Sequence, residues 1–217
     1  MISLSDAAES IIKRSPYLSE TFAKGLINTS ALARYLKPQL EKAVMKPVSD
    51  AAILMALRRL TKKLKLQTAS PNIFTSIPDI LVRSNLVEIN IMNSESLVHK
   101  HAEIVRLCSR QAKYFFTTTQ GLFETTIIVS NELLSQINSI LQGEKKEQTF
   151  IDLSAITIRL PKESLYTPGT YFLFLKSLAW EGVNFLEVVS AYLELTIILE
   201  EKEVNRAFGI LKSLFEN

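Results

Sequence analysis

The fold of this chain is decided by residues 156–190, which read ITIRLPKESLYTPGTYFLFLKSLAWEGVNFLEVVS. A short alternating strand over Ile156–Leu160 leads into a Pro168-Gly169 turn, and an apolar segment of helical length follows up to Trp180. Gly182 is suited to end that helix in a left-handed turn, and a second strand is expected over 184–191. The stretch therefore predicts a strand, a helix and a returning strand.

The same order of elements occurs twice in the sequence. The second copy continues with a strand over 193–199 and a helix over 203–215. The pattern of the first copy predicts a strand over 86–92, a helix over 95–111, an antiparallel pair over 114–119 and 123–129, and a helix over 133–141. The sequence therefore predicts an internal duplication of a β-α-β-β-α unit.

The first 66 residues show only helical periodicity, with apolar positions at 8–12, 32–44 and 53–64. Thr29 or Ser30 is expected to cap the second of these helices and Ser49 the third. A helix, the turn 45–48 and a second helix with a basic end have the layout of a helix-turn-helix.

The predicted fold class is α+β. Its parts are a helical helix-turn-helix-like domain over 1–66, a connector or wing over 67–84, a first repeat over 85–153 and a second repeat over 154–217.

Charge is divided unevenly along the chain. Residues 1–66 hold 12 Lys and Arg against 5 Asp and Glu, a net of +7, whereas residues 67–217 hold 13 against 17, a net of −4. A basic N-terminal part favours a polyanion as its partner, although a solvated basic surface is the plainer explanation. Arg58, Arg59, Lys62 and Lys63 are the candidates for phosphate contacts.

Ser49 and Asp50 begin the candidate recognition helix and are expected to lie nearer to base edges. Two alternatives stay open, because basic residues at a helix end also complement its dipole and helix-turn-helix folds also bind proteins.

The Pro168-Gly169 turn is the candidate ligand site. Pro168 suits the start of a helix, Gly169 allows close approach to the backbone, and the amides around Thr167, Gly169 and Thr170 would favour a carboxylate. Asn184 is expected at the same end of the sheet, where its amide would contact the amine or side chain of an amino acid. The alternative is that both positions serve only as ordinary turn residues.

These motifs resemble the regulatory ACT domain of aspartokinases. The resemblance rests on 156–161, on Thr-Pro-Gly at 167–169, on Gly-Val-Asn at 182–184 and on 187–190. The first repeat resembles a degenerate copy, with Asn-Ser-Glu-Ser at 93–96 in place of Thr-Pro-Gly. With its basic head, the whole chain resembles small prokaryotic proteins that join a helix-turn-helix to tandem ACT domains. Nothing in it resembles the kinase part of an aspartokinase.

Each ferredoxin-like repeat needs a fourth strand, yet the second helix of the second copy is followed by none. Gln148–Leu153 is a candidate fourth strand for the first copy, and Ile80–Val82 is a candidate for exchange with the second. The resemblance implies such strand sharing, and the two sheets are expected to be continuous or packed side by side.

Catalytic and metal-binding motifs are not apparent. Six glycines form no phosphate-binding loop, Cys108 is the only cysteine and is expected in the core, and His99 and His101 lie on a charged helix. We therefore expect no catalytic residue, no metal and no cofactor. The lack of a long apolar run or a signal-peptide pattern predicts a cytoplasmic protein without a membrane contact.

The preferred interpretation is an amino-acid-responsive transcriptional regulator that binds DNA through its N-terminal domain. The alternative is a stand-alone regulatory subunit that binds an amino acid and docks on a biosynthetic enzyme. A third possibility is a structural dimer without ligand binding. A homodimer is expected in each case, with Trp180 and Tyr192 near the contact, because exposed sheet edges commonly pair.

Overall fold

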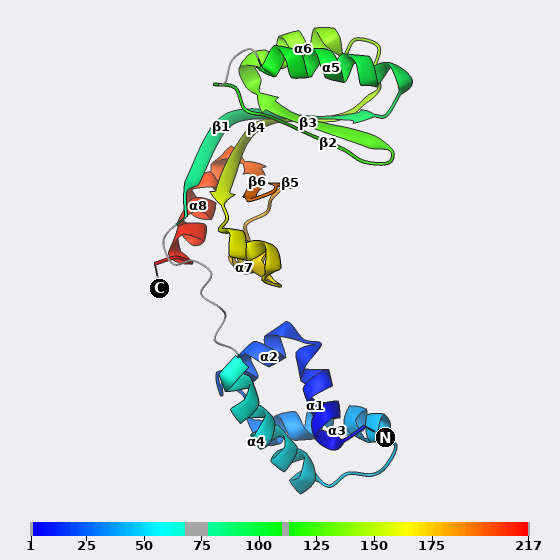
Figure 1. Ribbon diagram of the computed structural model, residues 1–217, viewed down its shortest axis with the longest axis vertical. Coiled ribbons are helices and arrows are strands. Elements are labelled where there is room, and N and C mark those ends of the chain that lie inside the picture. Colours follow the sequence, from blue (N-terminus) through cyan, green and yellow to red (C-terminus); the bar gives the residue numbers. More distant parts are fainter. Residues whose placement is uncertain (1, 68–77, 110–112, 217) are drawn as a thin grey trace. The chain divides into compact units, whose positions relative to one another are not determined.

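The structure is a computed structural model that describes residues 2–67, 78–109 and 113–216. The chain forms two compact units, Met1–Asn72 and Ile73–Asn217 (Figure 1). The first contains only helices in its described part, and the second contains an antiparallel sheet with helices. The predicted mixed fold is therefore confirmed at this level.

The helical unit consists of α1 (Leu4–Lys13), α2 (Pro16–Ala23), α3 (Thr29–Val44) and α4 (Asp50–Gln67). Their apolar faces meet in one core, whose fully buried members are Ala8, Ile12, Leu36, Leu40, Ile53 and Leu57. The sequence prediction missed α2, which is short and begins at Pro16 after the N-cap Ser15. The α3 cap was also placed wrongly: Asn28 accepts the amides of Ser30 and Ala31 at 3.0 and 3.1 Å.

The turn between α3 and α4 is fixed by its own hydrogen bonds. Met45 ends α3 in the left-handed region, at a φ of 56°. The Val48 amide donates to the Glu41 carboxylate at 3.0 Å, and the Ala52 amide donates to the Ser49 hydroxyl at 3.2 Å. The predicted Ser49 cap is thus confirmed, and the start of α4 is held in place.

The sheet unit repeats one order of elements. The first copy consists of β1 (Ile80–Met92), α5 (Glu95–Ser109), β2 (Phe116–Gln120), β3 (Glu124–Ser130), a 3₁₀ turn η1 (Asn131–Leu133) and α6 (Leu134–Ile140). The second consists of β4 (Lys146–Arg159), η2 (Lys162–Tyr166), α7 (Thr170–Trp180), β5 (Glu187–Ala191), β6 (Glu194–Glu200), η3 (Glu201–Glu203) and α8 (Val204–Ser213). The predicted β-α-β-β-α order is present in both copies.

The two long strands β1 and β4 join the copies. In the described residues the strand order is β2-β3-β1-β4-β6-β5, and every pairing is antiparallel. Residues 80–83 pair with 155–158 of β4, whereas 86–92 pair with β3 and with the first half of β4. Ile80–Arg83 is therefore the fourth strand of the second copy, and 146–153 is the fourth strand of the first.

The connector predicted over 67–84 extended too far. Residues 80–84 belong to β1, because the backbone of 80–83 pairs with 155–158 of β4. Residues 68–77 lie outside the described residues. The joint between the two halves of β1 falls at Asn85, and that of β4 falls at Asp152; both have positive φ, at 59° and 55°, beside shifts of register.

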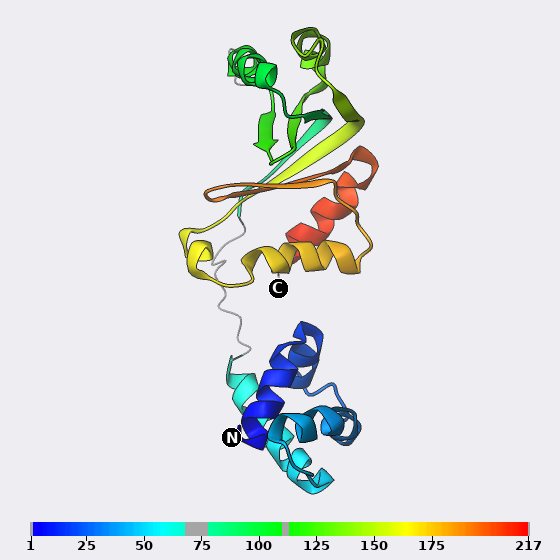
Figure 2. The same cartoon turned by 90° about the vertical axis from the view of Figure 1, so that its right-hand side faces the viewer.

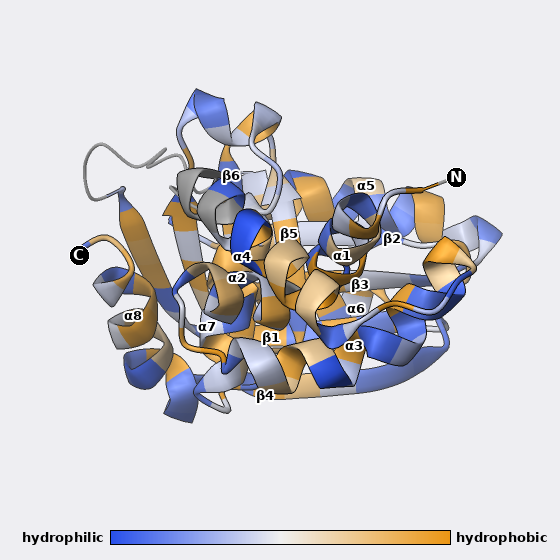
Figure 3. Cartoon of the chain, turned by 90° about the horizontal axis from the view of Figure 1, so that it is seen from below, coloured by the Kyte–Doolittle hydropathy of each residue, from blue (hydrophilic) through white to orange (hydrophobic). Residues whose placement is uncertain are grey.

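Each copy buries one pair of helices against its half of the sheet. Helices α5 and α6 cover the half formed with β2 and β3, and α7 and α8 cover the half formed with β5 and β6 (Figures 1 and 2). Helix α8 alternates between apolar and polar segments, as expected for a helix with one buried side (Figure 3). A smaller core, which includes Leu86, Ile128, Leu153, Ala155 and Ile198, lies where the halves meet.

A carboxyl group is buried close to this junction. Glu88 is 2% exposed on β1, opposite Ile128 and Phe150. Its Oε1 accepts from the Asn90 amide at 2.8 Å, and its Oε2 has no partner in the described residues. Burial raises the pKa of Glu88, and the nearby Glu187 carboxylate raises it further, against the effect of Asn90. Burial also raises the pKa of Glu187.

We expect Glu88→Gln to stabilise the protein increasingly as pH rises. A raised folded-state pKa favours folding below the unfolded pKa of about 4.3, and this contribution is lost as pH rises through the folded pKa. At pH 7 an ionised, half-satisfied carboxylate costs about 1–3 kcal/mol that an amide avoids in part. Thermal unfolding between pH 4 and 8 should show the melting temperatures of variant and wild type diverging. The exposed Glu132→Gln is the control, and parallel curves for Glu88→Gln would disprove this role.

Candidate functional site

The N-terminus of α7 is built without a capping side chain. Its N-cap is Gly169, which has a φ of +85° and a ψ of 5° and makes no side-chain cap hydrogen bond. The first helical bond runs from the Leu173 amide to the Gly169 carbonyl at 3.1 Å. The amides of the first turn therefore have no carbonyl partner within the helix, and they lie at its positive end.

The two threonines beside Gly169 stabilise the turn. The Thr170 hydroxyl donates to the Thr167 carbonyl at 2.9 Å, and the Thr167 hydroxyl donates to the Glu163 carbonyl at 2.8 Å. A Cβ added to Gly169 would meet nothing within 4 Å. Four of the five predicted ligand-site residues, 167–170, thus form one short turn in which no side chain caps the helix.

Asn184 lies at the other end of α7, and the predicted proximity to Gly169 is wrong for a single chain. Helix α7 spans residues 170–180, a length of about 16 Å at 1.5 Å per residue. The chain leaves β4, passes through η2 and enters α7 at Thr170. It leaves α7 at the left-handed Gly182 and then enters β5. Position 184 therefore follows the end of the helix, whereas position 169 precedes its start.

A small pocket surrounds Asn184. It has a volume of about 160 Å³ and is lined by Gly182, Asn184, Glu200, Lys202 and Glu203. The Lys202 ammonium pairs with the Glu200 carboxylate, and this hydrogen bond raises the pKa of Lys202. Glu200, Glu201 and Glu203 directly precede α8, where their carboxylates complement the positive end of its dipole.

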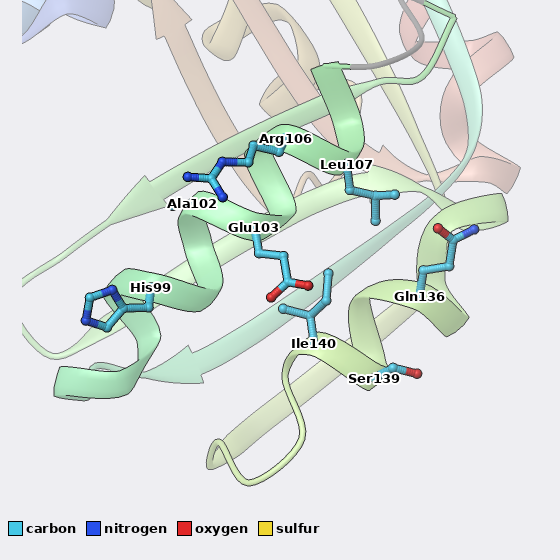
Figure 4. A pocket seen from close by; sticks show the side chains of 8 residues that line it. All are labelled: His99, Ala102, Glu103, Arg106, Leu107, Gln136, Ser139 and Ile140. Atoms are coloured by element: carbon cyan, nitrogen blue, oxygen red, sulfur yellow. The ribbon is translucent and has the colours of Figure 1, made fainter.

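A larger groove, of about 710 Å³, lies between α5 and α6. In Figure 4 Glu103 and Leu107 of α5 point toward α6, where Ile140 lies, while His99 and Arg106 point away from α6. The sequence predicted both helices but gave no sign of a groove, because their separation depends on how they pack on the sheet. The groove is open to solvent. Its lining mixes charged and polar side chains with apolar ones and singles out no ligand chemistry; the residues are His99, Ala102, Glu103, Arg106, Leu107, Gln136, Ser139 and Ile140.

The candidate nucleic-acid residues lie along one helix. On α4 the positions Ile53, Leu57 and Leu60 are buried, and Arg58 and Arg59 are exposed. Neither arginine has an ion pair or hydrogen bond within the described residues. The side chain of Lys62 lies outside what the structure describes.

Asp50 and Lys63 are engaged in ion pairs of the helical unit. The Asp50 carboxylate accepts from Lys37 at 2.7 Å, and this bond raises the pKa of Lys37. The Lys63 ammonium lies 2.6 Å from the Glu9 carboxylate, which also binds Lys13. Hydrogen bonds from Lys13 and then Lys63 lower the pKa of Glu9. Of the six candidates, Arg58 and Arg59 are the described side chains with free charge.

The described residues hold neither a metal-binding cluster nor a membrane-spanning helix. Within residues 2–67, 78–109 and 113–216, His, Cys, Asp and Glu side chains form no group of three that could hold a metal ion. None of the helices described is both long and apolar enough to cross a bilayer.

Several solved structures are similar to this chain in fold. The aspartate kinase of Clostridium acetobutylicum is similar with a TM-score of 0.53 and 14% identity, over 65% of this chain and 35% of that enzyme. A structure of aspartokinase alpha and beta subunits matches with a TM-score of 0.53 and 15% identity, over 65% of this chain and 100% of that one. The ligand-free regulatory subunit of aspartate kinase from Thermus thermophilus matches with a TM-score of 0.52 and 13% identity, over 64% and 99%.

This chain thus spans about a third of the length of the Clostridium kinase and nearly all of the Thermus regulatory subunit. No protein-family model matches the sequence, and none of the curated proteins compared with it is similar. At these identities the likeness concerns the fold alone, and it supports the ACT-type repeat fold that the sequence motifs predicted. The sheet unit has the fold of aspartokinase regulatory domains.

Proposed function

We propose that this chain is an amino-acid-responsive regulatory protein whose second repeat binds the α-carboxylate of a free amino acid at the N-terminus of α7. The observation that carries the proposal is the helix end capped by Gly169, with no capping side chain and no atom within 4 Å of where a Cβ of Gly169 would lie. Such an end favours an anion through unpaired amides and the helix dipole. The likeness to a regulatory subunit of aspartate kinase supports the same class of function.

Closure of this site requires a second copy of the chain. Asn184 is about one helix length from Gly169 within a chain, so its proposed contact with the ligand's amine needs a homodimer in which opposite ends of two copies meet. Strand β5 is an outer strand of the sheet, and Trp180 and Tyr192 beside it are 60% and 72% exposed. These features support a dimer contact along this edge.

The helical unit is proposed as the output domain, a helix-turn-helix-like part over 1–66 that binds DNA. Two observations support this: the net charge of +7 in this segment and the free, exposed Arg58 and Arg59 on α4. An alternative output is docking on a biosynthetic enzyme. The match to a regulatory subunit that exists as a separate chain favours it.

Arg58→Ala combined with Arg59→Ala is expected to weaken DNA binding about tenfold or more. Each lost phosphate contact should lower the slope of log affinity against log salt by about 0.9. The measurement is binding of a labelled duplex between 50 and 300 mM salt. Lys13→Ala with Lys24→Ala is the matched control, because it removes the same charge from side chains already paired with Glu9 and Glu20.

An equal loss in both double variants would contradict a specific role for the α4 arginines. A wild type that does not bind DNA even at 50 mM salt would exclude the DNA-binding output and favour enzyme docking.

A further inference from the structure

The start of α5 holds a carboxylate of the chain itself. The Ser94 hydroxyl caps the helix by accepting the Leu97 amide at 3.1 Å. The same hydroxyl donates to one Glu144 carboxylate oxygen at 2.6 Å, and the Ser96 hydroxyl donates to the other at 2.6 Å. Lys100, one turn further along α5, lies 2.7 Å from that second oxygen.

This carboxylate is enclosed and firmly ionised. Its side chain is only 3% exposed, and the Lys100 ammonium also donates to the Gln142 carbonyl at 2.7 Å. Hydrogen bonds from Lys100, Ser94 and Ser96 lower the pKa of Glu144 to about 2. Two hydroxyls, one ammonium and the positive end of a helix therefore surround a single carboxylate, which is the set of groups that a bound carboxylic acid would need.

The corresponding place in the second copy is organised differently. Helix α5 follows β1, and α7 follows β4, so the two N-termini are equivalent in the duplicated order. Ser94 and Ser96 stand at the first, and Gly169 stands at the second without a capping side chain. Glu144 comes from the turn between α6 and β4, and no described side chain makes the equivalent contact with the start of α7.

We propose that Glu144 occupies the carboxylate position of the first copy as a built-in substitute for a ligand, so that only the second copy is available to a free amino acid. The restriction to one ligand per chain rests on the proposed function. The carboxylate subsite made by Ser94, Ser96 and Lys100 does not, because it follows from the contacts of Glu144 alone.

The test is recovery of a Glu144→Ala variant by acetate, with thermal unfolding of the full chain as the measurement. The variant should melt several degrees below wild type at pH 7, and sodium acetate should raise its melting temperature saturably relative to equal sodium chloride. Wild type should not respond to acetate beyond the chloride control. The double variant Glu144→Ala with Lys100→Ala should not recover, because one donor of the subsite is gone.

Glu144→Gln keeps the test decisive if the alanine variant does not fold. The amide fills the same space, but it has one accepting oxygen where the carboxylate has two, so some of the hydrogen bonds from Ser94, Ser96 and Lys100 are lost. We therefore expect intermediate stability and no response to acetate. The proposal is overturned if Glu144→Gln is as stable as wild type at pH 7, or if acetate stabilises Glu144→Ala no more than it stabilises wild type.

Calorimetric titration of the wild type with an amino acid that binds should give one ligand per chain. Two ligands per chain would contradict occupation of the first copy by Glu144. If no amino acid binds, the proposed function fails, and the acetate experiment still decides the role of Glu144.

Discussion

Replacement of Gly169 by alanine is expected to weaken amino-acid binding by at least about tenfold, which corresponds to about 1.4 kcal/mol. The added methyl group meets no atom of the described chain, but it projects from the backbone that the ligand's carboxylate must approach. The positive φ of 85° also makes alanine unfavourable there, at a cost of about 1–2 kcal/mol in stability. Titration calorimetry measures the first effect, and thermal unfolding measures the second.

Gly25→Ala is the matched control for this variant. Gly25 has a φ of 73°, and a Cβ there would also meet nothing within 4 Å. It lies in the helical unit, which holds none of the proposed ligand contacts. We expect the two variants to lose similar stability and Gly169→Ala alone to lose most of its affinity. Equal affinities for the two variants would place the ligand away from the start of α7.

Ile80→Asp is expected to destabilise the second copy strongly, although position 80 precedes the first copy in sequence. Ile80 pairs with Ile158 of β4 and packs against the core beneath α7 and α8. A carboxylate at this position places charge against apolar side chains, at a cost of about 2–4 kcal/mol. For a unit of this size the melting temperature should fall by roughly 5–15 °C.

Leu81→Asp separates this packing effect from a general effect of charge on the strand. Leu81 is the next residue of β1 and is 64% exposed, so its substitution should cost less than about 0.5 kcal/mol. Hydrogen exchange should locate the loss in Ile80→Asp mainly in β5, β6 and α8. Similar costs for both variants would argue against strand sharing as a source of stability for the second copy.

Local patterns in the sequence were sufficient to predict most of the elements. The strands predicted over 86–92, 123–129 and 156–160 are present, because each of them buries one face against helices. The motif around Thr167 and Gly169 also predicted a helix start at the right place. The apolar residues Ile80–Val82 also suggested that a strand preceding the first copy joins the sheet of the second copy.

Such local patterns did not predict which residues lie close together when this depends on the path of the chain. The distance between Gly169 and Asn184 follows from the direction of α7, which the motif alone does not give. The contacts of Glu144 with Ser94 and Ser96 join residues about 50 positions apart, and the sequence marks none of them. The α3 cap was missed for a simpler reason, since Asn28, Thr29 and Ser30 are all good capping residues.

A carboxylate site at the start of α7 is tested most directly by calorimetric titration of the whole chain with each of the twenty amino acids. Any amino acid that binds is then compared with its decarboxylated amine. We expect at least one amino acid to bind at millimolar concentration or below, one molecule to bind per chain, and the amine lacking the carboxylate not to bind. Binding of none of the twenty, or equal binding of an amino acid and its decarboxylated amine, would contradict a carboxylate site at the start of α7.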